Sequence, residues 1–566
     1  MHPVMIVGID GCAPGLVERW AEGGELPTIA RLMADGCFAT LRSTPNYQSA
    51  SAWTSMVTGV NPGKHGIFHF MNPQPGSYEL VQIDATARKA ASIWRLLSDA
   101  GAHVTALNFP VSYPAEEVRG VQVAGWLAPS ATSPGFSHPP ELAWELVARF
   151  GPYPIQPDVR RHTSAGRYEQ GVSSALAGIR YKAEVGRWLL GQQRGDLFGI
   201  VFTESDSVQH WYWHLLDPSH PEHDRELARA HGDAILRVYR ALDAAIGRLL
   251  ESAGEEVNIL IVSDHGQAAN PRGQVFLRGW LRETGLLVAR DEGGGRIARL
   301  AGGVGRGVNA LLGGGLEFLK RRAPNALKVR LARRLPGLRA RSLAGMRRIT
   351  PDWERTRAWT ETGHIFINLK GRQPNGIVEP GDEYEKLLDS IARELLSLTE
   401  AESGERPVRE VVRGSEVMHG PCAALMPDLL VHWRNEVPVR RLAWQRPDGE
   451  RVSIEPPRKL QLPSGAHHPD GVLVAAGPDF REGLRAEALS IYDVAPTVLH
   501  LLGQAVPSYF DGKVATHLLP EEAAAGVRVR EMRPGEGAGP PGDRVADEAG
   551  VVQERLRGLG YVNGGQ

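Results

Sequence analysis

The chain has few of the features that would place it in several common classes of protein. It contains only three cysteines in 566 residues, Cys12, Cys37 and Cys422. Three thiols give neither an even disulfide framework nor a paired Cys-x-x-Cys metal site, which favours a reducing compartment. No apolar run approaches the ~18 residues that a membrane span needs, and the first residues lack the basic segment and the apolar length of a signal peptide. We therefore expect a soluble, cytoplasmic protein.

The sequence also lacks an excess of charge of either sign. The 64 Lys and Arg residues almost balance the 65 Asp and Glu residues. Nothing in the overall charge indicates nucleic acid or an anionic membrane as a partner, and we expect no nucleic acid-binding module. The length fits several average domains or one large α/β core with insertions.

Short runs rich in Val and Ile alternate with segments of helical spacing. The predicted strands are 4–9, 103–108, 197–203, 257–262 and 471–476, and the clearest helical segments are 26–33, 93–97 and 225–252. This alternation predicts an α/β fold with a mostly parallel central sheet and helices on both faces. Ligands of such sheets gather at the carboxyl ends of the strands.

Two regions interrupt this pattern. The first is rich in Gly and Arg, and the second is a tail rich in Gly, Pro and charge. We predict a core in two parts, 1–290 and 351–520, the second with smaller inserted elements, separated by a basic helical cap at 291–350 and followed by a flexible linker and short C-terminal helix at 521–566.

The basic cap and the last helix each have two interpretations. The cap is either a solvated basic helix face, as most charge runs are, or a lid facing an anionic substrate or lipid headgroups. The amphipathic segment 551–561 could dock on the body of the protein or on a second subunit, which leaves a homo-oligomer open.

Potential metal ligands follow the predicted strands. Asp10 ends the first strand and precedes Gly11, a residue suited to a sharp turn beside a ligand. Asp206 and His210 follow the third strand four residues apart, so a helical turn would point both side chains the same way. Taken singly, such residues are often turn, capping or surface residues. Their common position after strands favours a metal site.

Two further pairs of adjacent residues complete the candidate set. Asp264 and His265 follow the fourth strand after Ser263, and a turn at Gly266 could bring both to one cation. His467 and His468 lie in a predicted loop before the fifth strand; we choose His467 as the ligand, with His468 as its rival.

Mixed carboxylate and imidazole donors suit Zn²⁺ or Mn²⁺. Two such ions about 4 Å apart could hold the attacking and leaving oxygens of a phosphoryl transfer. We predict one ion at Asp10, Asp264 and His265, the other at Asp206, His210 and His467, with a nucleophilic hydroxyl at Ser49 bridging them. Cys12 is either a thiolate ligand or, as we prefer, a small packed residue.

The order of these residues resembles that of the alkaline phosphatase superfamily, in particular its type I phosphodiesterase/nucleotide pyrophosphatase branch. The resemblance extends over most of the chain and is densest at 49–68, which is similar to that family's nucleophile segment. Further landmarks are 371–378, 427–429 and 493–497. The resemblance implies an alkaline phosphatase-like fold, two divalent metal ions and Ser49 as the nucleophile, with Ser51 as its rival.

The candidate ligands predict a metal-dependent phosphohydrolase that acts on a small-molecule phosphate ester, and the resemblance implies a phosphodiesterase in preference to a phosphomonoesterase. Ser49 would form a phosphoseryl intermediate that water hydrolyses. One alternative is a phosphoglycerate mutase-like phosphotransferase, which would use the same ligands. Another is a non-enzymatic binding protein for phosphorylated ligands or membrane headgroups.

Overall fold

The computed structural model describes residues 1–192, 195–290, 350–446, 448–457, 462–533, 535–536 and 552–553. The predicted basic cap at 291–350, apart from its last residue, and most of the predicted C-terminal helix at 551–561 therefore lie outside the described residues. None of the described helices combines the length and apolar character needed to cross a bilayer.

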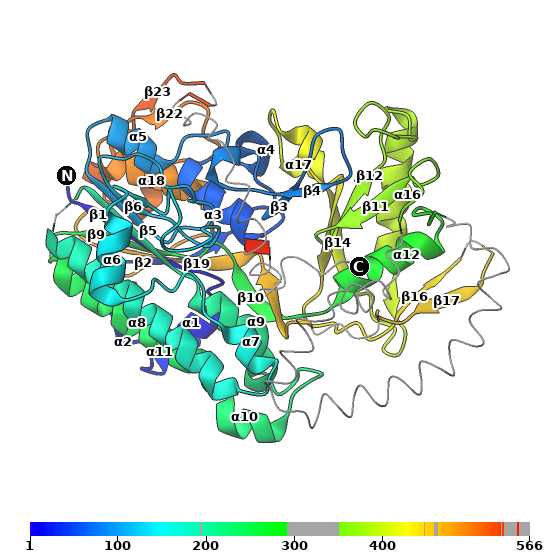
Figure 1. Cartoon of the computed structure of the whole chain (residues 1–566), viewed down its shortest axis with the longest axis horizontal. Coiled ribbons are helices and arrows are strands. Elements are labelled where there is room, and N and C mark those ends of the chain that lie inside the picture. Colours follow the sequence, from blue (N-terminus) through cyan, green and yellow to red (C-terminus); the bar gives the residue numbers. More distant parts are fainter. Residues whose placement is uncertain are drawn as a thin grey trace, which may run out of the picture.

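A ten-stranded sheet forms the larger lobe of the molecule (Figure 1), with the strand order β20-β2-β19-β9-β1-β8-β5-β6-β7 and β21 beside β2. Most neighbours are parallel; β19 is antiparallel to β2 and β9, and β7 to β6. This confirms the predicted mostly parallel sheet. The strands are β1 (Val4–Ile9), β2 (Cys37–Arg42), β5 (Val104–Leu107), β6 (Gly120–Val123), β7 (Ser137–His138), β8 (Leu197–Phe202), β9 (Asn258–Val262), β19 (Asp470–Ala476), β20 (Leu484–Arg485) and β21 (Leu489–Ser490).

Helices cover both faces of this sheet because its central strands are apolar on both sides. Along β1, Met5 and Val7 join one buried cluster, whereas Val4 and Ile6 join the other. The helices on the first face are α1 (Pro14–Glu22), α2 (Pro27–Ala34), α6 (Leu142–Phe150), α8 (Tyr168–Gln192), α9 (Glu204–Leu216) and α11 (Ala234–Ala253). Those on the second are α3 (Ser49–Thr58), α5 (Ile93–Asp99) and α18 (Val494–Leu501). Each fully buried large apolar side chain contributes roughly 1.5–3 kcal/mol to this packing.

A second lobe is built from separate, smaller sheets (Figure 1). One has the order β11-β12-β15-β14 and the other β13-β16-β17, and both share an apolar cluster with two helices. The elements are α12 (Leu277–Glu283), β11 (Ala358–Glu361), β12 (His364–Ile367), α16 (Asp382–Ser397), β13 (Thr399–Glu400), β14 (Val408–Arg413), β15 (Leu429–Trp433), β16 (Leu442–Gln445) and β17 (Arg451–Ile454). The exact domain boundaries stay a prediction.

A two-stranded antiparallel ribbon connects the lobes near the middle of the molecule. It pairs β10 (Gly266–Ala269) with β18 (Gly465–His468), and Gln267 lies opposite His467. The prediction of a loop around His467 is therefore wrong. This segment pairs with a strand about two hundred residues earlier in the chain, and the local sequence does not reveal such a distant partner.

The remaining described elements are short. They are α4 (Pro62–His65), β3 (Met71–Pro73), β4 (Leu80–Gln82), α7 (Val159–Thr163), α10 (Arg225–His231), α17 (Gly414–Val417), β22 (Val506–Pro507), α19 (Glu521–Ala524) and β23 (Val529–Arg530). The last of them, β23, pairs in parallel with β22, and the start of the flexible linker stays a prediction.

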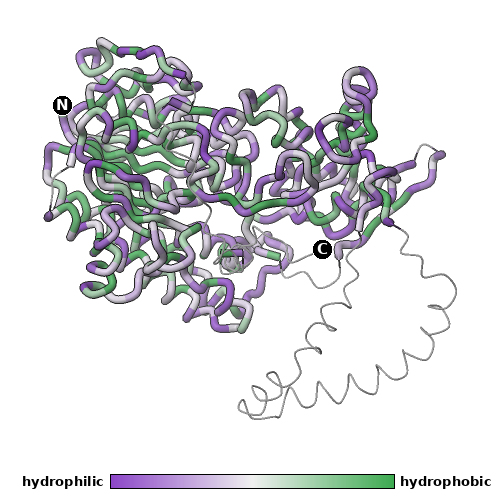
Figure 2. Tube along the Cα trace, turned by 45° about the horizontal axis from the view of Figure 1, so that its top comes forward, coloured by the Kyte–Doolittle hydropathy of each residue, from purple (hydrophilic) through white to green (hydrophobic). Residues whose placement is uncertain are grey.

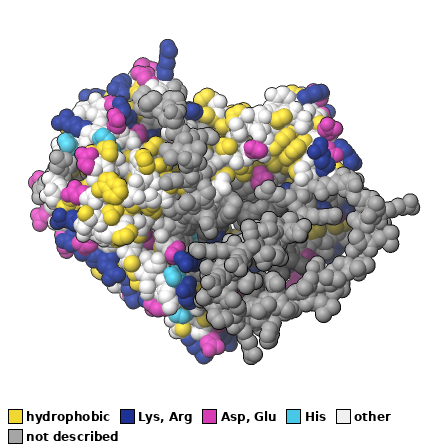
Figure 3. All heavy atoms as spheres, in the orientation of Figure 1, with side chains coloured by type: hydrophobic (Ala, Val, Ile, Leu, Met, Phe, Trp, Pro, Cys, Tyr) yellow, Lys and Arg dark blue, Asp and Glu magenta, His cyan; other side chains and the backbone are white. Residues whose placement is uncertain are grey.

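Hydropathy and charge follow this architecture. In Figure 2 the apolar segments run through the interior of the larger lobe and polar segments lie at its periphery. On the face drawn in Figure 3, the described Lys and Arg side chains stand among Asp and Glu side chains. This mixture agrees with the nearly neutral overall charge.

Candidate active site

Three neighbouring parallel strands place three aspartates at one edge of the sheet. β1 lies between β8 and β9, and the three run in register. Asp10 directly follows β1, Asp206 lies in the first turn of α9 after β8, and Asp264 follows β9 after one intervening residue. All three side chains are fully buried. The three aspartates therefore converge at the carboxyl ends of the strands, as predicted.

Each of these carboxylates has one oxygen held by a donor and one without a hydrogen-bond partner. Asp10 Oδ2 accepts from the Trp53 indole at 3.0 Å, and Asp206 Oδ1 accepts from Gln267 Nε2 at 3.0 Å. Asp264 Oδ1 accepts from the Gly11 amide at 3.2 Å. The atoms without a hydrogen-bond partner are Asp10 Oδ1, Asp206 Oδ2 and Asp264 Oδ2. Buried carboxylate oxygens without a hydrogen-bond partner are what a cation site requires.

Gly11 allows the close approach of these groups. It adopts a positive φ of 67°, and a Cβ at this position would lie 3.2 Å from Asp206 Oδ1. A side chain here would be strained and would crowd the cluster.

Three histidines share one hydrogen-bonding arrangement. In each, Nδ1 lies within hydrogen-bonding distance of a backbone carbonyl: His210 with Gly465 at 2.9 Å, His265 with Gly266 at 2.9 Å, and His467 with Tyr47 at 3.0 Å. A ring that donates through Nδ1 presents the lone pair of Nε2, which is the arrangement that orients histidine ligands of metals.

The donors form two groups, within each of which the ligand atoms lie no more than 4.8 Å apart: Asp206, His210 and His467, and Asp10, Asp206 and His265. The first is the set predicted for one ion. In the second, Asp206 takes the place predicted for Asp264, whose Oδ2 nevertheless lies 3.2 Å from His265 Nε2. Asp206 is thus common to both groups, and the residues fit a pair of divalent cations.

Electrostatics also indicate a site that needs positive charge. Burial, together with the neighbouring Asp264 and Asp206, raises the pKa of Asp10 well above its ordinary value. Burial likewise raises the pKa of Asp264 to about 6. Burial alone would raise the pKa of Asp206, but the adjacent imidazoles, first that of His210, lower it to about 2. Burial lowers the pKa of His467, so this ring is held neutral, as a metal ligand must be.

Ser49 is the hydroxyl beside this cluster. It begins α3, is fully buried, and its Oγ lies 2.9 Å from His265 Nε2. Ser51 Oγ is buried without a hydrogen-bond partner. Of the two adjacent histidines, His467 has its Nε2 3.6 Å from Asp206 Oδ1, whereas His468 Nδ1 accepts from the Asp470 amide.

The sequence did not predict two residues of the site, Trp53 and Gln267, and the structure shows that Cys12 is a packed residue. Trp53 and Gln267 bind ligand carboxylates, but nothing in their local sequence signals contacts that span 43 and 61 residues. Cys12 is fully buried, which raises the pKa of its thiol to about 12. A protonated thiol is the packed residue that we preferred, not a thiolate.

Comparisons with known proteins give one family for the chain. A sequence profile of the type I phosphodiesterase / nucleotide pyrophosphatase family matches residues 4–321, more than half of the chain. A search of curated protein sequences returned no match.

Solved structures also align with the chain. Phosphonoacetate hydrolase from Sinorhizobium meliloti 1021 aligns with a TM-score of 0.50 and 15% identity, covering 87% of this chain and 94% of that one. Murine ectonucleotide pyrophosphatase / phosphodiesterase 5 aligns with a TM-score of 0.46 and 14% identity, covering 92% and 100%. At such identities, the hydrolase alignment supports the fold alone.

The fold and the matched profile define a hydrolase of phosphoester bonds in the alkaline phosphatase superfamily. More narrowly, the chain belongs to the type I phosphodiesterase / nucleotide pyrophosphatase family. This assignment decides against the non-enzymatic binding protein. Members of the family depend on metal ions, which agrees with the two donor groups.

Proposed function

We propose that the protein is a phosphodiesterase that uses Ser49 as its nucleophile and two divalent cations, Zn²⁺ or Mn²⁺, as cofactors. The observation that carries the proposal is the position of Ser49 Oγ, 2.9 Å from His265 Nε2 at a buried cluster of three carboxylates. One cation would be held by Asp206, His210 and His467, and the other by Asp10, Asp206 and His265, with Asp264 beside it.

The bound cations would neutralise the phosphate and favour the ionised form of the Ser49 hydroxyl. The residues of the chain supply position. Ser49 stands at the start of α3, where buried packing fixes its backbone, and the Nδ1 contacts fix the three imidazole rings. Attack by Ser49 Oγ on phosphorus breaks the bond to one alcohol, which leaves with a proton, and joins the phosphoryl group, still esterified to the second substituent, to the serine. Water then attacks the phosphorus and breaks its bond to Ser49, which releases the phosphomonoester and restores the hydroxyl.

A matched pair of serine variants tests the proposal. On the metal-reconstituted protein, Ser49→Ala should lower kcat for bis(p-nitrophenyl) phosphate at least about 1,000-fold, as loss of a nucleophile does. Ser51→Ala is the control, because it truncates a neighbouring buried hydroxyl, and should stay within a few-fold of wild type. Equal activities of Ser49→Ala and wild type would overturn the proposal.

The choice among hydrolysis of diesters, hydrolysis of monoesters and phosphoryl transfer is tested by the products. In ¹⁸O-labelled water, a diesterase places one label in the phosphomonoester product. A phosphomonoesterase places it in inorganic phosphate, and a mutase-like transferase places no label in its product. We expect label in the phosphomonoester, and we place the enzyme in the cytoplasm, which cell fractionation tests.

A further inference from the structure

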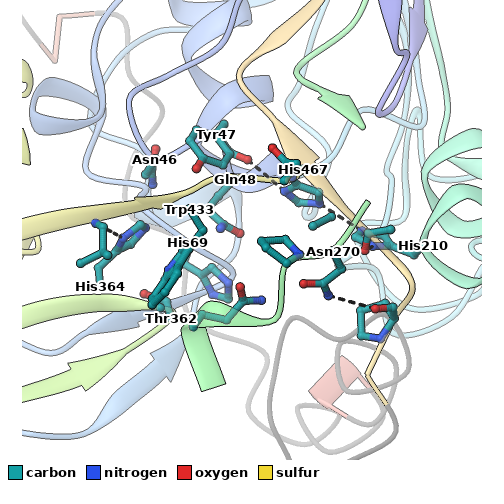
Figure 4. A pocket seen from close by; sticks show the side chains of 18 residues that line it. Asn46, Tyr47, Gln48, His69, His210, Asn270, Thr362, His364, Trp433 and His467 are labelled. Atoms are coloured by element: carbon teal, nitrogen blue, oxygen red, sulfur yellow. Dashed lines mark hydrogen bonds between the residues drawn. The ribbon is translucent and has the colours of Figure 1, made fainter. Parts of the chain in front are cut away.

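A cavity of about 180 Å³ opens directly beside the candidate active site. His210 and His467 line one side of it, and residues of the second lobe line the other (Figure 4). It is smaller than the ~300–1,000 Å³ of clefts that bind drug-sized ligands. A substituent attached to a phosphoryl group at the cluster would enter this space, and the space suits a small one.

The far side of the cavity presents a buried donor that nothing else in the described chain uses. His364, the first residue of β12, is 6% exposed, and its Nδ1 accepts from the Val431 amide at 3.4 Å. Burial lowers the pKa of His364 to about 3, so the ring is neutral and its single proton is on Nε2. His364 Nε2 is buried without a hydrogen-bond partner. In Figure 4 this ring lies beside His69, facing the pocket.

A buried acceptor lines the same cavity. Asn46 is 2% exposed, and its Nδ2 donates to the Phe68 carbonyl at 2.6 Å, which fixes the amide and identifies Oδ1 as the remaining acceptor. Asn46 Oδ1 has no hydrogen-bond partner. A buried donor and a buried acceptor that lack partners destabilise the protein, and a ligand that pairs with both removes this cost.

The rest of the lining carries no acidic side chain and no Lys or Arg among the described residues. It includes amides and one indole, those of Asn46, Gln48, Asn270, Gln274, Asn435 and Trp433, beside histidines and small or apolar residues. Amides and aromatic faces suit hydroxyl groups and the apolar face of a polyol or sugar. Away from the proposed cation site at His210 and His467, an additional phosphate or carboxylate would find no counter-charge on these walls.

Backbone strain coincides with this cavity. Of the five described non-glycine residues with positive φ, two line it: Tyr47 at 32° and Thr362 at 54°. A β-branched residue such as Thr362 rarely adopts this strained conformation, which persists where the surrounding fold imposes it. Thr362 lies in the β11–β12 turn, two residues before His364, so the strained turn presents the donor to the cavity.

We propose that this cavity binds an uncharged, hydroxyl-bearing substituent of the phosphodiester, a small polyol or a single sugar, with His364 Nε2 as the specificity-determining donor and Asn46 Oδ1 as the acceptor. The inference rests on the proposed function, because it places the phosphoryl group at the Ser49 cluster. A hydroxyl group satisfies both atoms, since it accepts from one and donates to the other.

Three phosphodiesters test the inference. Each carries one p-nitrophenyl group, and they differ only in the second substituent, which is 2,3-dihydroxypropyl, propyl or 2-carboxyethyl. For the wild-type protein we expect kcat/KM for the dihydroxypropyl ester to exceed that for each of the others at least about 10-fold, the cost of leaving buried groups unpaired. In His364→Phe, which keeps a ring but removes the donor, the ratio of dihydroxypropyl to propyl ester should fall toward one. His517→Phe, at an exposed histidine, is the control and should keep the wild-type ratio.

A binding measurement separates this inference from the proposed function. Calorimetry of the dihydroxypropyl and propyl esters on metal-loaded Ser49→Ala, with and without His364→Phe, reports the same preference without turnover. Three results would overturn the inference and leave the proposed diesterase function standing. They are a dihydroxypropyl-to-propyl ratio near one in the wild type, a preference for the carboxyethyl ester, and the same dihydroxypropyl-to-propyl ratio in His364→Phe as in the wild type. If no ester is hydrolysed, the proposed function fails, and the binding ratio alone decides the assignment of the cavity.

Discussion

At the scale of single residues, the site depends on side chains that orient the candidate ligands as much as on the ligands themselves. Trp53 holds one oxygen of Asp10, and Gln267 holds one oxygen of Asp206. Such supporting groups typically change metal affinity or activity 10–100-fold when they are removed.

Trp53→Phe should therefore weaken metal binding and lower kcat/KM by roughly 10–100-fold. The matched control is Trp94→Phe: Trp94 is also a buried indole that donates to a carboxylate, Glu116, at 2.6 Å, but away from the site. Both variants should lose stability, and only Trp53→Phe should lose metal affinity in a competition titration with a chelator. Equal metal affinities would show that the indole contributes to packing alone.

A buried histidine makes stability depend on pH. His65 Nδ1 accepts from the Ile67 amide and its Nε2 bonds Ser55, and burial lowers its pKa from 6.5 to about 3. Because the unfolded chain takes up this proton first, the free energy of unfolding falls as the pH falls from about 6.5 toward 3. Between pH 7.5 and 5 the loss is about 2 kcal/mol.

His65→Asn keeps an acceptor for the Ile67 amide and removes this titration. Urea unfolding at pH 7.5 and pH 5 should show a pH-dependent loss of stability that is smaller by about 2 kcal/mol than in the wild type. If the two proteins lose stability in parallel, the folded protein accommodates the charged imidazole, and the assignment is wrong.

At the scale of elements, the helix that carries Asp206 and His210 is anchored by a buried ion pair. Lys182 Nζ of α8 lies 2.8 Å from Glu204 Oε1 at the start of α9, and both side chains are fully buried. Lys182→Met leaves this carboxylate unpaired and should cost about 3–5 kcal/mol. The double variant Lys182→Met/Glu204→Leu removes both buried charges and should recover most of that loss.

An exposed pair provides the control for the ion pair. Arg31 and Asp35 lie 3.6 Å apart with side chains 59% and 60% exposed, so Arg31→Met should cost less than about 1 kcal/mol. Urea unfolding compares the variants. Losses of equal size in Lys182→Met and Arg31→Met would contradict an anchoring role for the buried pair.

The elements predicted from the sequence are those with strong local patterns. Central strands such as β1 and β9 are buried on both faces and read as continuous apolar runs. By contrast, β18 has the sequence Gly-Ala-His-His and forms because β10 pairs with it. The 225–252 segment divides into α10 and α11. Candidate ligands were found because they follow strong strands; Trp53 and Gln267 were not, because their roles arise only from tertiary contacts.

At the scale of the whole molecule, the two lobes meet at the cavity beside the donor cluster, so the site joins groups from most of the chain. The apolar clusters of each lobe do not include the ligands. We therefore expect the protein to remain folded after chelation but to lose stability, because cations bind the folded chain in preference to the unfolded one.

Adding Zn²⁺ at 100 times its Kd should stabilise the chelated protein by about 2.7 kcal/mol per site, measured as a rise in Tm. In Asp206→Asn most of the rise should disappear, since this carboxylate belongs to both donor groups. A rise of the same size in Asp206→Asn would place the binding ions elsewhere.

The central claim is that residues spread from position 10 to position 467 hold two cations beside Ser49. Anomalous X-ray diffraction from crystals of Zn²⁺-reconstituted protein tests it most directly. We predict two neighbouring peaks, one at Asp206, His210 and His467 and one at Asp10, Asp206 and His265, with Ser49 Oγ facing them. A single peak, or peaks away from these side chains in a fully reconstituted protein, would contradict the account.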